Sequence, residues 1–175
     1  MTTTQDGLYE VAAREYAAAL KRLARAYEAD PEKCRDLLQD IHVALWRSFA
    51  NFNGACSTRT WIFRIAHNAA ISHVVRERRR NAPVVLGLEE IEGMPAPESA
   101  PDNNRRQRLA QLLQMVRQLK PIDREVILAY LEDMDAREIA EITGLSPSNV
   151  ATKIYRIKNI MAVRFRTGGG VEREH

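Results

Sequence analysis

A run of polar and basic side chains near the C-terminal end of the chain has the composition of a surface that binds DNA. The short polar residues Ser148, Asn149 and Thr152 come first, and the cations Lys153 and Arg156 follow them. Hydroxyl and amide groups can hydrogen-bond to base edges in a major groove, while cations contact phosphates. The pattern predicts a helix that reads duplex DNA. The alternative is a helical hairpin with a solvated basic face.

Two helices joined by a sharp turn are predicted around these residues. Asp135 and Glu138 have the spacing of a capping box, and Gly144 suits a left-handed residue that ends the first helix. Ser146 can cap the second helix, with Pro147 at its first position. A short turn that contains glycine is typical of a helix–turn–helix. The second helix has one apolar stripe, formed by Val150, Ile154, Ile157 and Met161.

A second stretch, residues 58–80, predicts a long helix that combines aromatic rings with cations. Trp61 and Phe63 lie at helical spacings, where core packing is the usual role of an aromatic ring. The alternative is that some of these rings border a basic site where the bases of single-stranded nucleic acid stack. Arginines are frequent along this stretch and at its end: Arg59, Arg64, Arg76, Arg78, Arg79 and Arg80.

The charge distribution agrees with two sites for one polyanion. The chain has 175 residues, enough for one or two small domains, and a formal net charge of only +3. The basic residues gather in the two stretches above, and acids gather between them at Glu89, Glu90, Glu92 and Glu98. This arrangement suits a polyanion held at two places, whereas the modest total charge argues against a non-specific coating protein.

The fold class predicted is all-α, with two helical lobes joined by a linker. Amphipathic helices are predicted from about residue 8 to 29 and from 31 to 50, before the long helix, so that the first lobe covers residues 1–80. Four prolines mark residues 81–104 as a linker, although its apolar residues give it a means to dock. Helices resume in a second lobe, residues 105–166, and the glycine-rich tail 167–175 is predicted to be disordered.

Catalytic, metal and membrane functions have little support. His67 and His73 lie six residues apart, not the three or four that place two ligands on one helix face. No catalytic sequence motif is present, so we expect neither an enzyme nor a cofactor. Cys34 and Cys56 form no Cys-x-x-Cys pair, which fits a reducing cytoplasm. No signal peptide or membrane span is predicted.

Two stretches together resemble the extracytoplasmic-function (ECF) subfamily of bacterial RNA polymerase sigma factors. The first stretch, DLLQDIHVALWRSFANFNGACSTRTWIFRIAHNAAISHVVRERRR, resembles region 2 of that family. The second stretch, LKPIDREVILAYLEDMDAREIAEITGLSPSNVATKIYRIKNIM, resembles region 4. The resemblance covers about two-thirds of the chain, in the family's order. The matching positions of the first stretch are Asp36-Leu37, Gln39-Asp40, Trp46, Phe52, Gly54, Thr60-Trp61, Arg64-Ile65-Ala66, Asn68 and Arg76 to Arg80.

The resemblance implies a role for each matching surface. Asp36, Gln39 and Asp40 would dock on core RNA polymerase, a role that replaces the interpretation of this patch as plain solvated surface. The second helix of the helix–turn–helix would read the −35 element in duplex DNA through Ser148, Asn149, Thr152, Lys153 and Arg156. The −10 element would be opened and its single strand held by Asn53, Arg59, Trp61, Arg64, Asn68 and Arg76.

The chain departs from the family pattern at four positions. Many members have Arg, an acid and Ser where this chain has Asn53, Ala55 and Cys56, which implies an unusual −10 pocket. Ala151 stands where Lys is common, so one phosphate contact would be missing. A redox-sensing role for Cys56, beside this loop, is the alternative to simple packing.

The function expected from the resemblance is promoter recognition and melting in complex with core polymerase. The expected partners are core polymerase, promoter DNA and an anti-sigma factor, in the cytoplasm and without membrane insertion. The alternative is a dimeric helix–turn–helix regulator of duplex DNA, with the N-terminal lobe as a sensor or dimerisation module. Such a regulator has no need of a second nucleic-acid surface that contains Trp61.

Overall fold

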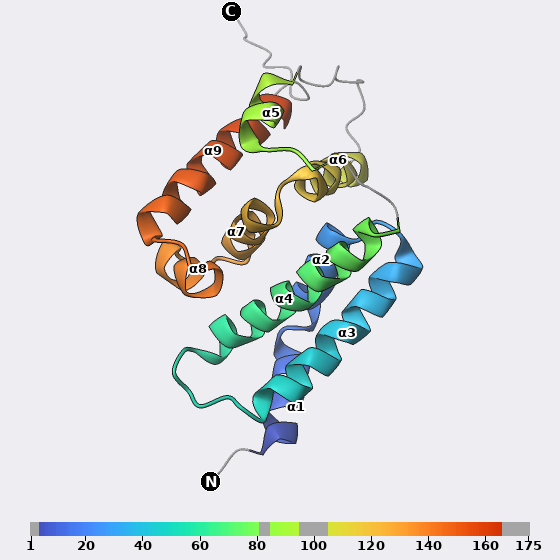
Figure 1. Ribbon diagram of the computed structural model, residues 1–175, viewed down its shortest axis with the longest axis vertical. Coiled ribbons are helices and arrows are strands. Elements are labelled where there is room, and N and C mark those ends of the chain that lie inside the picture. Colours follow the sequence, from blue (N-terminus) through green and yellow to red (C-terminus); the bar gives the residue numbers. More distant parts are fainter. Residues whose placement is uncertain (1–3, 81–84, 95–104, 166–175) are drawn as a thin grey trace, which may run out of the picture.

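The computed structural model describes residues 4–80, 85–94 and 105–165, and all the regular elements of this part are helices (Figure 1). The predicted all-α class is confirmed. The N-terminal lobe consists of α1 (Gln5–Glu15), α2 (Ala17–Tyr27), α3 (Pro31–Phe49) and α4 (Thr58–Arg78). The C-terminal lobe consists of α6 (Arg105–Gln118), α7 (Pro121–Leu131), α8 (Ala136–Thr143) and α9 (Pro147–Phe165), with the short α5 (Leu88–Gly93) alongside α9.

Local capping signals begin the helices that carry the predicted sites. The Asp30 carboxylate accepts the backbone N–H groups of Glu32 and Lys33 at the start of α3. The Ser57 hydroxyl accepts the N–H of Thr60 at the start of α4. The single helix predicted from 8 to 29 was wrong, because α1 and α2 are separate helices with a break at Tyr16. The ring of Tyr16 packs edge-on against Phe63, 6.2 Å between centroids.

The core of the N-terminal lobe lies between α2, α3 and α4. Leu20, Leu37, Ile41, Leu45 and Ile62 are completely buried there. Along the long helix α4, the polar residues His67 and His73 are buried, whereas the apolar residue Val75 is exposed. The reason is that α4 packs against α2 and α3 and also against α7 and α8 of the other lobe, so that more than one side is covered.

The segment predicted as a linker contains the helix α5. Its Leu88 and Ile91 are buried, and Leu86 forms an isolated β-bridge with Leu119 just before the helix begins. The Glu90 carboxylate accepts the backbone N–H of Gly87 and so caps the N-terminal end of α5. The apolar residues of this segment therefore hold it against the C-terminal lobe. The predicted tail, residues 167–175, lies outside the described residues.

Polar side chains form several of the contacts between the two lobes. Arg22 of α2 forms a bidentate ion pair with Glu132, at 2.6 and 2.7 Å. Arg117 donates a hydrogen bond to the carbonyl oxygen of Arg25 at 3.0 Å. The guanidinium of Arg124 lies 4.8 Å from the centroid of the Tyr27 ring. These contacts hold the C-terminal lobe beside α2 and α4 (Figure 1).

Two buried titratable groups lie at or near this interface. His67 is fully buried, its Nδ1 lies 3.0 Å from the Tyr27 hydroxyl, and its Nε2 has no hydrogen-bond partner among the described residues. Burial lowers the pKa of His67 to about 3. Burial also raises the pKa of Glu125, in α7, to about 7. Both groups therefore resist becoming charged, but they act on stability in opposite directions as the pH changes.

Replacing Glu125 with Gln should change the pH dependence of stability. Since folding raises the pKa of Glu125 from 4.5 to about 7, ionisation destabilises the fold at neutral pH and acidification removes that destabilisation. His67 acts the other way, since acid protonates it more readily in the unfolded chain. Between about pH 7 and about pH 5, Glu125→Gln should lose about 2 kcal/mol of unfolding free energy relative to the wild type.

Urea unfolding at the two pH values measures this difference. The Glu125→Gln variant should be more stable than the wild type at neutral pH and similar to it in acid. Two parallel pH profiles would show that Glu125 titrates normally in the folded chain.

Candidate nucleic-acid interface

The helix–turn–helix is formed by α8 and α9 as the local signals predict. The Asp135 carboxylate accepts the N–H groups of Arg137 and Glu138, and Glu138 accepts the N–H of Asp135 in return. Gly144 ends α8 at φ 75°, in the left-handed region that glycine adopts without strain. The Ser146 hydroxyl accepts the N–H of Asn149 at 3.2 Å and caps α9. The turn therefore fixes the direction in which α9 begins.

The N-terminal half of α9 presents polar groups to solvent. Ser148, Asn149 and Thr152 are all exposed. Tyr155, which was not among the predicted residues, is 68% exposed and lies on the same face as Ser148 and Thr152, at spacings of seven and three. A large ring left in solvent on an otherwise polar face is the signal that could have identified it. This face of α9 is therefore open to solvent.

The two predicted cations of α9 have partners within the protein. Lys153 donates to the carboxylate of Asp123 in α7 at 2.6 Å, and that carboxylate is only 4% exposed. Arg156 pairs with Glu92 at 2.9 Å and with Glu89 at 3.2 Å, both from α5. Lys153 therefore compensates a buried charge, whereas Arg156 is held by two exposed carboxylates.

The predicted −10 residues of α4 do not all lie together. Trp61, Arg64 and Asn68 share one helix face at spacings of three and four. Arg59 projects elsewhere and donates to the backbone carbonyl of Glu132, while Arg64 donates to the carbonyl of Glu141 at 2.6 Å. Both arginines therefore contact the C-terminal lobe in this conformation.

Trp61 combines a packed edge with an accessible one. Its ring lies 5.3 Å from that of Phe52, and its Nε1–H donates to the Ser48 hydroxyl at 3.0 Å. The side chain is only partly buried. The ring is thus held rigidly at the edge of the lobe, which suits both the core role and the stacking role considered from the sequence.

The loop before α4 and the end of α4 place the remaining predicted residues apart. The Asn53 side chain accepts the N–H of Ala55 at 3.1 Å, and Gly54 has φ 74°. Arg76 lies near the other end of α4, where it pairs with Asp40 of α3 at 2.7 Å. Arg76 therefore links the two predicted surfaces of the N-terminal lobe instead of joining Asn53.

The predicted docking residues form one exposed face of α3. Asp36, Gln39 and Asp40 are all exposed, at spacings of three and four. Val43, which was not predicted, continues this face and is 42% exposed. This face of α3 therefore combines acidic and amide groups with one exposed apolar side chain.

Within residues 4–80, 85–94 and 105–165, no group of three His, Cys, Asp or Glu side chains could hold a metal ion. The helices of these ranges include none that is long and apolar enough to cross a bilayer. Cys34 and Cys56 are both unpaired and partly buried, and burial raises the pKa of the Cys34 thiol.

Both halves of the chain match family models. The model described as sigma-70 region 2 matches residues 12–80, and the model described as sigma-70, region 4 matches residues 109–161. The two matched ranges contain all the predicted site residues discussed above.

Individual proteins are similar over most of the chain. The RNA polymerase sigma factor YlaC of Bacillus subtilis is 30% identical over 73% of this chain and 74% of its own length. The ECF RNA polymerase sigma factor SigG of Mycobacterium tuberculosis is 26% identical over 71% of this chain and 40% of its own length. Among solved structures, the sigma factor RpoE of Bartonella quintana, in complex with the anti-sigma factor NepR, has a TM-score of 0.66. Its identity is 19%, covering 94% of this chain and 98% of that one.

Proposed function

Because the chain belongs to the ECF-type sigma-70 RNA polymerase sigma factors, we propose that its two lobes bind different parts of one promoter. Sigma factors are transcription initiation factors without catalytic activity, and their family implies core RNA polymerase and promoter DNA as partners. The N-terminal lobe, residues 1–80, docks on core polymerase and holds the −10 element. The C-terminal lobe, residues 105–166, reads the −35 element, and residues 81–104 connect them.

The −35 assignment rests on the exposed polar face of α9. Ser148, Asn149 and Thr152 supply hydrogen-bonding groups in the first turns of a recognition helix, as the major groove requires. Tyr155 adds a ring that suits an apolar contact with a base, and Arg156 adds a cation for a phosphate. Lys153 has the separate role of pairing with the buried Asp123.

The −10 assignment rests on the combination of a rigid ring with cations. Trp61, Arg64 and Asn68 share a face that suits stacking and backbone contacts to an unpaired strand. Arg59 lies in the first turn of α4, Arg76 lies near its other end, and Asn53 lies in the preceding loop. The hydrogen bonds that Arg59 and Arg64 donate to the carbonyls of Glu132 and Glu141 compete with DNA for the same guanidinium groups.

Docking on core polymerase is assigned to Asp36, Gln39 and Asp40 of α3. Their support is a continuous acidic and amide face that Val43 extends with an exposed apolar group. We also propose cytoplasmic action, because core polymerase is there, and control by an anti-sigma factor. The support for the latter is that the structurally similar RpoE was solved with NepR bound.

Reconstitution with bacterial core polymerase tests the proposed function. Core enzyme, the purified chain and a pool of promoter fragments are combined, and the transcripts are sequenced at their starts. Transcripts with defined starts that depend on the chain are expected, and the selected fragments then give the −10 and −35 sequences. Binding to duplex DNA without binding to core polymerase would instead indicate the dimeric regulator.

Replacing Arg156 with Ala should weaken duplex binding and reduce its salt dependence. Removing one phosphate contact lowers the slope of log K against log salt by about 0.9. Fluorescence anisotropy over a range of salt concentrations measures both quantities. The Lys153→Ala variant is compared with it in stability. Because this variant leaves the buried Asp123 unpaired, its free energy of unfolding should fall by about 1–3 kcal/mol. An unchanged slope in the Arg156 variant would remove that residue from the DNA interface.

A further inference from the structure

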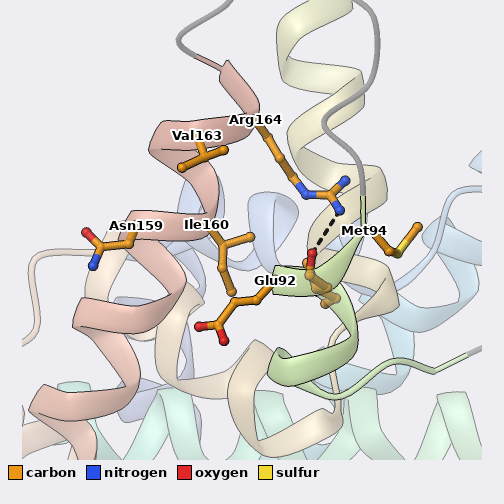
Figure 2. Close-up of a pocket in the computed structure, with 7 residues that line it drawn as sticks. Glu92, Met94, Asn159, Ile160, Val163 and Arg164 are labelled. Carbon is orange, nitrogen blue, oxygen red and sulfur yellow. Dashed lines mark hydrogen bonds between the residues drawn. The ribbon is translucent and has the colours of Figure 1, made fainter.

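The short helix α5 is attached to α9 by apolar contacts. Ile91 of α5 and Ile160 of α9 are both buried, and Arg164 donates a hydrogen bond to the carbonyl oxygen of Ile91 at 3.1 Å (Figure 2). Beside them is a small pocket of about 140 Å³, lined also by Met94 and Val163. The contacts fix the rotation of α5 about its axis and so determine which of its side chains face α9.

This orientation brings two carboxylates to the same guanidinium. Glu92 accepts from Arg156 Nε at 3.2 Å and from Nη2 at 2.9 Å, which is a bidentate arrangement. Glu89 accepts from Nη1 at 3.2 Å. All three nitrogens of Arg156 are therefore engaged, and hydrogen bonds with Glu92 and then Glu89 raise the pKa of Arg156.

A DNA phosphate would use the same donors. Guanidinium groups bind carboxylate and phosphate through the same planar pairs of N–H groups. Arg156 cannot satisfy Glu92 and a phosphate with the same two nitrogens at once. The carboxylates of α5 would in addition repel a DNA backbone that approached this side of α9.

We propose that α5 competes within the chain with DNA for Arg156 and thereby masks one side of the recognition helix. This inference rests on the proposed function of α9 in binding duplex DNA. Ser148, Thr152 and Tyr155 remain exposed, so the mask acts on the phosphate contact and leaves the base-reading face open. Full binding requires α5 to release Arg156.

The expected strength of the mask follows from the solvent exposure of the two ion pairs that Arg156 forms. The side chains of Arg156, Glu92 and Glu89 are 34%, 43% and 76% exposed, so solvent screens both interactions. An exposed ion pair changes an equilibrium by about 1.4- to fivefold, and two pairs that share one guanidinium are not fully additive. Removing both carboxylates should therefore strengthen duplex binding by about three- to tenfold.

The test compares charge removal on α5 with charge removal elsewhere. The full chain is titrated with a short fluorescein-labelled duplex, since a phosphate contact needs no particular sequence. The variant Glu89→Gln/Glu92→Gln should bind about three- to tenfold more tightly than the wild type. Glu10→Gln/Glu15→Gln removes the same charge from exposed positions of α1 and should bind much less tightly than the α5 variant. Equal affinities for the two double variants would overturn the proposal.

A double-mutant cycle with Arg156→Ala identifies the cause. If α5 acts by holding Arg156, the two glutamine substitutions should have little effect once Arg156 is absent. The same gain in both backgrounds would indicate a general field of the acids and would overturn the mask. Failure of the wild type and all variants to bind duplex would contradict the proposed role of α9 itself, and the mask would be excluded with it.

Hydrogen exchange gives a readout independent of affinity. In the wild type, the backbone amides of Leu88–Gly93 should exchange faster when saturating duplex is bound, because the hydrogen bonds of Arg156 no longer add to the apolar contacts that hold α5. Unchanged exchange of α5 on the bound chain would show that DNA binds without displacing it, which contradicts the proposal.

Discussion

Replacing Asp36 and Asp40 with Lys should abolish binding to core RNA polymerase. Both carboxylates are exposed on one face of α3, where Asp40 forms an ion pair with Arg76, which is itself exposed. Like charges brought together at an interface cost several kcal/mol, so affinity should fall by more than about 100-fold. Surface pairs of this kind contribute little to folding, and stability should change by about 1 kcal/mol or less.

Co-elution with core enzyme on size exclusion measures the loss, and thermal unfolding checks the fold. The matched control is Glu10→Lys/Glu15→Lys, which makes the same charge change at exposed positions of α1. Duplex binding by the full chain should persist in the α3 variant, because α9 is unaltered. If the α3 variant still formed a stable complex with core enzyme, the docking surface would have to lie elsewhere.

Replacing Trp61 with Ala should cause the second large loss, in the opening of promoter DNA. Stacking of a base on an aromatic side chain contributes about 1–3 kcal/mol, which corresponds to a decrease of about 5- to 150-fold in the open complex. Binding to core polymerase should be retained, since Trp61 lies on α4, away from the acidic face of α3. Permanganate reactivity of unpaired thymines near the start site measures the effect.

Two companion variants separate stacking from packing. Ser48→Ala removes the hydrogen bond to Trp61 Nε1 but keeps the ring, so opening should remain close to that of the wild type. Trp61→Phe keeps an aromatic face beside Phe52 and should restore much of the opening. A Ser48→Ala variant as defective as Trp61→Ala would mean that Trp61 acts through the packing of α3 on α4.

Local sequence signals were sufficient for the helix–turn–helix. Each signal depends on residues within a few positions of one another. These signals are the capping pair Asp135 and Glu138, the left-handed Gly144 and the cap at Ser146. Such signals can be recognised in sequence because the hydrogen bonds that they form are local. The exposed polar start of α9 follows from the same periodicity that predicts its buried stripe.

Contacts between distant segments could not be predicted in this way. His67 is polar, yet α2 supplies a tyrosine hydroxyl for it from 40 residues away. The sequence predicts Lys153 as a DNA contact but does not reveal that it pairs with the buried Asp123 of α7. Helical periodicity reports which side of a helix is apolar and contains no information about which polar residue another helix will cover. For the same reason, the sequence could not show that Arg59, Arg64 and Arg156 donate hydrogen bonds to other groups of the protein.

On the proposed function, the contacts between the lobes, from Arg22–Glu132 to Arg124–Tyr27, also determine what fraction of the molecules can bind both promoter elements. Two elements centred near −35 and −10 lie about 85 Å apart in B-form DNA, whereas a compact chain of this length has a radius of gyration of about 16 Å. The lobes must therefore separate before both elements are bound. The apparent dissociation constant equals the intrinsic one divided by the fraction of separated molecules. Each tenfold decrease in that fraction therefore weakens the apparent affinity for the complete promoter tenfold.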